Sequence, residues 1–186
     1  GGSMSCQDDA EAPWLAPPRQ LISRTVRAGT PFLGICLGHQ LATVALGGQV
    51  CTSDHFCLGA AEMHLTPEGK KDPLLSVYDG HRGIHFNNDV AVVLPEDAVL
   101  LARDPTGQIE AVRFAERAWG VQFHPECTPE IFDAWTIGHG EKEWQQRLPW
   151  SEAVTVAETV RRDIDTVNAE EAFAARFQEL IDPEKR

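Results

Sequence analysis

The sequence predicts a single α/β domain, and three observations support this expectation. Predicted helices and strands alternate early in the chain, a β-rich middle follows, and the end is helical. The chain has 186 residues, which is enough to bury one sizeable core. Residues 31–40 place a cysteine between a strand-like apolar run and a helix-like run. We therefore expect one domain over residues 1–186, with a helical tail over residues 150–186.

The first predicted element is a helix over residues 14–28. Its apolar side chains recur on one stripe, Arg24 and Arg27 lie near its end, and Gly29 follows as a stop signal. Upstream, Gly1-Gly2-Ser3-Met4 has two interpretations. It is either a short remnant of cloning or a glycine-rich turn after a strand that this chain lacks.

The second predicted unit is a strand, Phe32–Ile35, joined through Cys36 to a helix over residues 39–46. Gly34 and Gly38 flank the cysteine, as on a sharp strand-to-helix turn where side chains two places from a nucleophile would collide with the turn. A thiol at a helix N-terminus has a lowered pKa, so thiolate becomes available near neutrality. The alternative is an inert core thiol, because cysteine is among the most buried residue types.

The middle of the chain is predicted to form short strands. Asn87-Asn88-Asp89 is expected to be a turn between two of them, and residues 52–56 a polar loop. The expected strands or extended segments cover residues 49–51, 58–66, 80–86, 90–94, 99–102, 109–114 and 119–123.

Helical signals return after residue 127. Thr128 is expected to cap a helix with Pro129 in its first turn, and residues 138–140 are expected to interrupt the helical region. Ser151 is expected to cap a long helix whose apolar stripe reaches Val167. A final amphipathic helix is predicted around residues 173–181.

A second polar group follows the strand predicted over residues 119–123. His124 and Glu126 are two residues apart, so extended backbone places both side chains on one side. Glu126 can then hold one ring nitrogen of His124 while the other faces a thiol, which is what an activated nucleophile requires. The alternative is a surface His–Glu pair at the end of a strand.

Composition excludes several classes of function. The net charge of −12 argues against a nucleic-acid or anionic-membrane partner, and no apolar run approaches the length of a membrane span. The five cysteines show no disulfide framework, which fits a reducing cytoplasm. Cys51, His55 and Cys57 lack the spacing of a zinc site, so we expect no metal there.

The two motifs together resemble the class I glutamine amidotransferases, and most of all their stand-alone, GMP-synthetase-like members. The residues that carry the resemblance are Gly34-Ile35-Cys36-Leu37-Gly38-His39-Gln40 and Gly120-Val121-Gln122-Phe123-His124-Pro125-Glu126. The resemblance implies a doubly wound, flavodoxin-like fold with a mostly parallel central sheet and flanking helices. It favours the native interpretation of the opening glycines.

The resemblance also implies a mechanism. Cys36 would attack the side-chain amide of glutamine, His124 would protonate the leaving ammonia, and Glu126 would orient His124. The backbone N–H groups of Leu37 and Gly2 would hold the oxyanion. Gln40 would help to bind the substrate. The products would be glutamate, formed through a thioester, and ammonia for a separate synthase partner; no cofactor is implied.

The chain departs from the family pattern in two places. Members have strands and a helix before the opening glycines, so we expect N-terminal strands to be missing and residues 1–186 alone to be poorly stable. Relatives usually carry His before Asp89, where this chain has Asn87-Asn88. The substrate therefore stays open, and the alternatives are a thiol hydrolase of γ-glutamyl peptides and a non-catalytic regulatory module.

Overall fold

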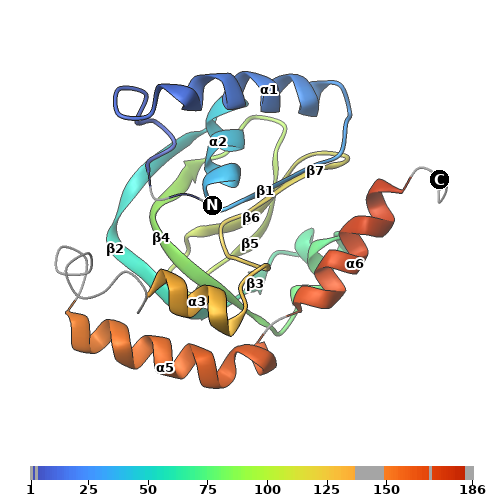
Figure 1. Ribbon diagram of the computed structural model, residues 1–186. Helices are drawn as coiled ribbons and strands as arrows, with labels where there is room; N and C mark the ends of the chain where they lie inside the picture. Colours follow the sequence, from blue (N-terminus) through green and yellow to red (C-terminus); the bar gives the residue numbers. More distant parts are fainter. Residues whose placement is uncertain (1, 3, 137–148, 168, 183–186) are drawn as a thin grey trace.

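A mixed β-sheet forms the centre of the molecule, and a long two-stranded ribbon lies beside it (Figure 1). The computed structural model describes residues 2, 4–136, 149–167 and 169–182. The sheet has the order β1-β7-β6-β5-β3, and the ribbon pairs β2 with β4. The strands are β1 Phe32–Ile35, β2 Gln49–Glu62, β3 His64–Leu65, β4 Arg82–Val93, β5 Val99–Arg103, β6 Ile109–Ala115 and β7 Ala118–Val121. The helices are α1 Ala16–Arg27, α2 Leu37–Ala45, α3 Pro129–Trp135, α5 Trp150–Val167 and α6 Glu170–Ile181, with 3-10 turns at Pro13–Leu15, Gly69–Lys71 and Leu75–Tyr78.

Parallel pairing in the described sheet is confined to β1 and β7, so the expectation of a mostly parallel sheet needs correction. Phe32 pairs with Ala118 and Ile35 with Val121, whereas β7–β6, β6–β5 and β5–β3 are antiparallel. Short turns join β5 to β6 and β6 to β7, and such turns connect only antiparallel neighbours. The α/β class with flanking helices is confirmed, and its sheet is mixed.

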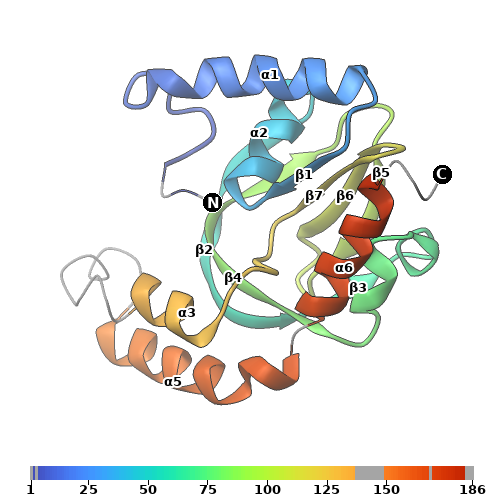
Figure 2. The same ribbon diagram turned by 45° about the vertical axis from the view of Figure 1, so that its right-hand side comes forward.

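Helices cover both faces of the sheet (Figure 2). Along β7, Trp119 and Val121 point to one face, where they pack with Phe173 of α6. Ala118 points to the other face, where it packs with side chains of α1 and α2. The core therefore lies in two layers, one on each face of the sheet, with β1 and β7 between them.

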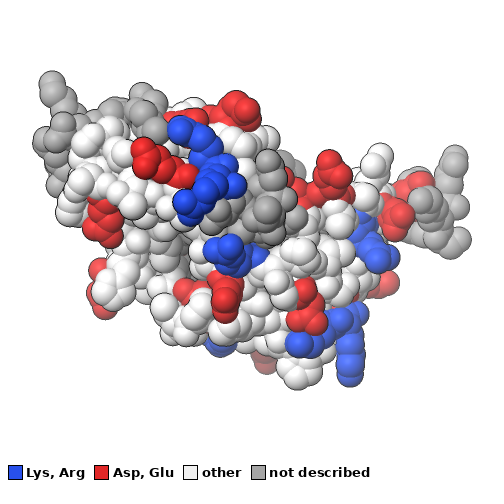
Figure 3. All heavy atoms as spheres, turned by 90° about the horizontal axis from the view of Figure 1, so that it is seen from below, with Lys and Arg blue, Asp and Glu red and all other residues white. Residues whose placement is uncertain are grey.

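The ribbon of β2 and β4 has its own helical cover. Phe132 of α3 and Ala157 of α5 pack against Ile84 of β4, and Arg161 pairs with Asp133 between the two helices. On the face that carries α5, acidic and basic side chains are interspersed and neither sign forms a continuous patch (Figure 3). Among the helices that the structure describes, none is both long and apolar enough to cross a membrane.

Several predicted elements are confirmed. Phe32–Ile35 is a strand, and the Thr128 hydroxyl caps α3 by accepting a hydrogen bond from the Ile131 N–H. The helix predicted over residues 14–28 forms as α1, preceded by a 3-10 turn. Residues 138–140 lie outside the described part of the chain.

Three predicted boundaries are wrong. Asn87-Asn88-Asp89 is no turn: β4 runs through it, with Asn87 opposite Cys57 and Asp89 opposite Thr52. The predicted polar loop at residues 52–56 is instead an irregularity inside β2, where the register shifts. Ladder pairing between the two strands overrides the local turn preference of the asparagines. Helix α5 begins at Trp150, so Ser151 lies inside it and does not cap it.

Candidate active site

Cys36 occupies a strained turn between β1 and α2. Its backbone has φ 50° and ψ −109°, and it is the one non-glycine residue with positive φ in the described part of the chain. A Cβ on Gly34 would lie 2.6 Å from the Gly38 carbonyl oxygen, so a side chain there is excluded. A Cβ on Gly38 would meet nothing within 4 Å, so the expected collision holds for Gly34 and is wrong for Gly38.

The parallel pairing of β1 with β7 brings the two motifs together. The Cys36 N–H donates to the Val121 carbonyl at 2.8 Å, so the cysteine lies where β7 ends. Three residues further on, the His124 N–H donates to the Ile84 carbonyl of β4 at 2.8 Å. His124 is thus held between the sheet and the ribbon, at the same sheet edge as Cys36.

The imidazole of His124 is held by two predicted partners. Its Nδ1 lies 2.7 Å from Glu126 Oε1, and the Cys36 side chain lies near enough to the ring to raise its pKa. Burial lowers the pKa of His124, but the hydrogen bonds with Cys36 and Glu126 and their charges outweigh burial and raise it to about 9. Burial raises the pKa of Glu126, and the bond to His124 reverses this, so that the net shift is downward.

A cleft of about 560 Å³ opens beside these residues. Cys36, His124, Gln40 and Gly2 all line it, so four of the predicted site residues share one cavity. Trp135 also lines it, and its ring lies 4.5 Å from the His124 ring. Sequence reasoning missed Trp135, because nothing in its local pattern shows that α3 packs over the ribbon and brings this ring to His124.

The two predicted oxyanion residues lie in contact. A Cβ on Gly2 would come within 2.6 Å of the Leu37 side chain, so the opening segment passes directly beside the start of α2. Leu37 is the first residue of α2, where backbone N–H groups lack acceptors within the helix. The two residues are therefore neighbours at the turn that carries Cys36.

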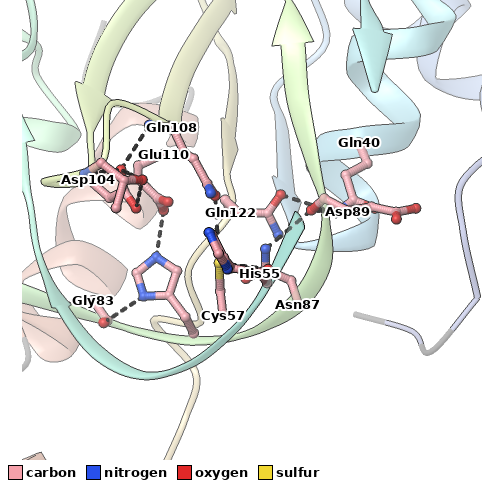
Figure 4. Close-up of polar contacts among 12 residues, drawn as sticks. Gln40, His55, Cys57, Gly83, Asn87, Asp89, Asp104, Gln108, Glu110 and Gln122 are labelled. Atoms are coloured by element: carbon pink, nitrogen blue, oxygen red, sulfur yellow. Dashed lines mark hydrogen bonds and ion pairs between the residues drawn. The ribbon is translucent and has the colours of Figure 1, made fainter. Parts of the chain in front are cut away.

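Gln40 is buried, and its amide nitrogen is already engaged. It donates to the Asp89 carbonyl at 2.8 Å and to Gln122 Oε1 at 3.1 Å (Figure 4). Asn87 Nδ2 donates to the same Asp89 carbonyl at 3.2 Å. The structure therefore ties Gln40 to β4 and to the residue that follows β7, and its amide nitrogen is not free to reach a ligand.

A second buried His–Glu pair lies behind the cleft, and the sequence showed no pattern for it. His85 Nε2 lies 2.6 Å from Glu110 Oε2, and Nδ1 lies 3.0 Å from the Gly83 carbonyl. Burial lowers the pKa of His85, but Glu110 and the Gly83 carbonyl reverse this and raise it. The pair joins the ribbon to the sheet.

His39, Cys51 and Cys57 are not among the described residues that line the cleft. His39 is fully buried against Phe114, and burial lowers its pKa to about 4, which fits the expected packing role. Cys51 is exposed on β2, and Cys57 lies 3.6 Å from Gln108 Oε1. Within the described ranges, no three His, Cys, Asp or Glu side chains are grouped so that they could hold a metal ion.

Comparison with known proteins places this site in context. Residues 11–138 match the family Glutamine amidotransferase class-I. The chain is 37% identical to the glutamine-hydrolyzing GMP synthase of Marinobacter nauticus over 115 residues, covering 54% of this chain and 20% of that protein. It is 34% identical to one subunit of the glutamine-hydrolyzing GMP synthase of Methanothermobacter thermautotrophicus over 101 residues, covering 52% of this chain and 51% of that one. The chain thus spans about half or less of these relatives.

Solved structures support the fold. A glutamine amido transferase from Methylobacillus flagellatus superposes with a TM-score of 0.78 at 24% identity, covering 98% of this chain and 75% of that one. A glutamine amidotransferase from Thermotoga maritima gives a TM-score of 0.77 at 20% identity, covering 98% and 76%. At these identities the likeness shows a shared architecture.

Proposed function

Because this chain belongs to the class I glutamine amidotransferase family, we propose that it hydrolyses the side-chain amide of glutamine with Cys36 as nucleophile. The observation that supports the proposal is that His124, 2.7 Å from Glu126, lines the same cleft as Cys36 and interacts with its side chain. A nucleophile, a base and a group that orients the base are the three parts that thiol catalysis requires.

In the first half of the reaction, the Cys36 thiolate attacks the amide carbon. The strained backbone of Cys36 presents the sulfur at the N-terminus of α2, where the helix dipole favours negative charge. His124, protonated because its pKa is raised to about 9, gives its proton to the leaving nitrogen. The C–N bond breaks, ammonia leaves, and a glutamyl thioester remains on Cys36.

In the second half, water hydrolyses the thioester. His124, now neutral, takes a proton from water as the new C–O bond forms and the C–S bond breaks. Glu126 accepts from Nδ1 throughout, which keeps the other nitrogen directed at the sulfur. Glutamate is released and the thiolate is restored.

The oxyanion of each intermediate is assigned to the N–H groups of Leu37 and Gly2. The contact between these residues beside the cleft supports this assignment. One such donor is worth about 10²–10³ in rate. The role proposed for Gln40 is narrower than expected: with its nitrogen engaged, it shapes the cleft floor through Asp89 and Gln122.

We further propose that the ammonia serves a separate synthase. The support is that one relative is named as a single subunit of GMP synthase, which implies a second subunit for that protein. A synthase partner for this chain would be recognised by glutaminase activity that rises when the partner is added.

The decisive experiment measures ammonia and glutamate from glutamine, together with labelling by a diazo-ketone analogue of glutamine. We expect turnover and a single adduct on Cys36, with both lost in Cys36→Ser. His39→Gln is the control, because His39 lies in the core away from the cleft. Labelling of Cys36 without turnover of glutamine or a γ-glutamyl peptide would instead support a regulatory module.

A further inference from the structure

Three aromatic side chains form one wall of the cleft, and they come from three different elements. Phe56 lies on β2, Phe86 on β4 and Trp135 on α3, and all three line the cavity. Their rings are in contact in series, with centroids 5.5 Å apart for Phe56–Phe86 and 5.8 Å apart for Phe86–Trp135. Such a wall offers an apolar surface to a ligand.

One end of the aromatic wall, Trp135, lies beside the group that protonates the leaving nitrogen. Trp135 lies 4.5 Å from the ring of His124, which is the proposed donor of a proton to the leaving nitrogen. A substituent on that nitrogen would meet Trp135 and then Phe86 and Phe56. Ammonia has no carbon body and gains nothing from these rings. The cleft volume of about 560 Å³ leaves room for a longer leaving group.

The charges in the cleft select among leaving groups. Of the described side chains that line it, Asp8 and Asp89 are carboxylates, none is Lys or Arg, and the cation is the His124 imidazolium beside Cys36. One carboxylate suits the α-ammonium group of a glutamyl substrate. A leaving group that carries its own carboxylate, such as an amino acid, would meet repulsion from these residues. A simple amine avoids it.

Asn87 adds a polar anchor to the same arm of the cleft. It is only 6% exposed, it lines the cavity, and its Oδ1 is buried without a hydrogen-bond partner. A buried acceptor without a partner costs about 1–3 kcal/mol, so a ligand that brings a donor is favoured. A secondary amide retains one N–H that can serve as this donor.

We infer that the cleft accepts γ-glutamyl amines, whose amide nitrogen carries an apolar carbon chain without a carboxylate, in addition to glutamine. The inference rests on the proposed function and uses the same nucleophile. The Cys36 sulfur bonds to the carbonyl carbon of the γ-glutamyl amide, the C–N bond breaks, and His124 protonates the leaving amine. Water then hydrolyses the thioester, so that one amide and one water give glutamate and one amine.

The test compares three substrates: glutamine, γ-glutamyl-butylamide and γ-glutamyl-4-aminobutyrate. The last two have leaving groups of equal chain length that differ in one carboxylate. The measured quantity is kcat/KM for glutamate release. We expect γ-glutamyl-butylamide to exceed glutamine at least tenfold and to exceed γ-glutamyl-4-aminobutyrate at least tenfold.

A variant series tests the subsite. Phe56→Ala is expected to reduce the ratio of kcat/KM for γ-glutamyl-butylamide over glutamine at least fivefold. Val92→Ala is the matched control, since Val92 is an exposed apolar residue of β4 outside the cleft lining. That substitution is expected to leave the ratio unchanged.

The outcomes separate the two claims. Hydrolysis of glutamine with no preference for γ-glutamyl-butylamide overturns the inference and leaves the proposed function intact. Equal rates for the two N-substituted substrates overturn the charge selection. Failure on all three substrates, with no adduct of the diazo-ketone analogue on Cys36, overturns the proposed function and the inference together.

Discussion

Two buried histidines are each paired with a glutamate, and only one of the two, His124, lines the cleft. His124 Nδ1 lies 2.7 Å from Glu126, and His85 Nε2 lies 2.6 Å from Glu110. His124 also interacts with the Cys36 side chain, whereas the second nitrogen of His85 donates to the Gly83 carbonyl. The Glu126 side chain is 40% exposed and that of Glu110 is 1% exposed. A histidine–glutamate pair is thus accessible to a ligand at His124 and Glu126, whereas at His85 and Glu110 it joins two strands inside the core.

The charge state of each pair follows from its surroundings. A carbonyl oxygen can only accept, so His85 donates from both nitrogens when it bonds Gly83 and Glu110, and its raised pKa favours this imidazolium. His124 is also held as a cation, with a pKa of about 9, but one of its partners is the Cys36 thiol group. The His85 cation bonds a backbone carbonyl and Glu110 and cannot give its proton to a substrate. The His124 cation lines the cleft with Cys36 and can do so.

The largest contrast is expected from removing the histidine that faces the cleft. His124→Ala should lower kcat/KM for glutamine by about 10⁴-fold, since one group serves as acid and then as base. The folded state should persist, as checked by the denaturation midpoint. Retention of a tenth of the activity would show that another group transfers the proton.

The next contrast concerns stability. Glu110→Gln should lower the free energy of unfolding by about 3–5 kcal/mol, because it leaves a buried imidazolium without its counter-charge. The matched Glu126→Gln change should cost less than about 1 kcal/mol, because solvent reaches that carboxylate. Urea denaturation at neutral pH measures both. Equal losses would mean that the two pairs do the same structural work.

The pH profile sharpens the comparison further. A pKa of His124 raised from 6.5 to about 9 means that the imidazolium and the stability it adds are fully present below 6.5 and are lost as pH rises through about 9. We expect kcat/KM for glutamine to fall above about 9. Glu126→Gln removes one cause of the shift, so the alkaline limb should move to lower pH. If the alkaline limb did not move, its pKa would belong to a group other than His124.

The smallest effect is expected at the ring that packs on His124. Trp135→Leu should lower kcat/KM for glutamine about 2–10-fold, because an aromatic contact is worth about 0.5–1.5 kcal/mol. Trp14→Leu is the matched control, since Trp14 is 52% exposed and lies outside the cleft lining. If both substitutions reduced activity equally, the contact between Trp135 and His124 would not contribute to activity.

Much of the candidate site could be predicted because its determinants are local. The strand Phe32–Ile35, the turn at Cys36 and the need for glycine at position 34 all depend on residues within a few positions. The spacing of His124 and Glu126 likewise places both side chains on one side. Their roles stay predictions until they are tested.

Other features could not be predicted, because they depend on which strands become neighbours. Asn87-Asn88-Asp89 has the composition of a turn, yet pairing with β2 makes it strand. Gln40 belongs to the motif around Cys36, but its hydrogen-bond partners lie on β4 and directly after β7, far along the chain. Trp135 reaches His124 only because α3 packs back over the ribbon.

The sequence by itself determined the family, the nucleophile turn and the residues that could do chemistry, because glycine sterics, capping and side-chain alternation act over a few residues. The tertiary structure alone decided which of two buried histidines faces a thiol and which is sealed against Glu110. That choice depends on the register between strands distant in the chain, and a one-residue slip would turn each side chain to the opposite face.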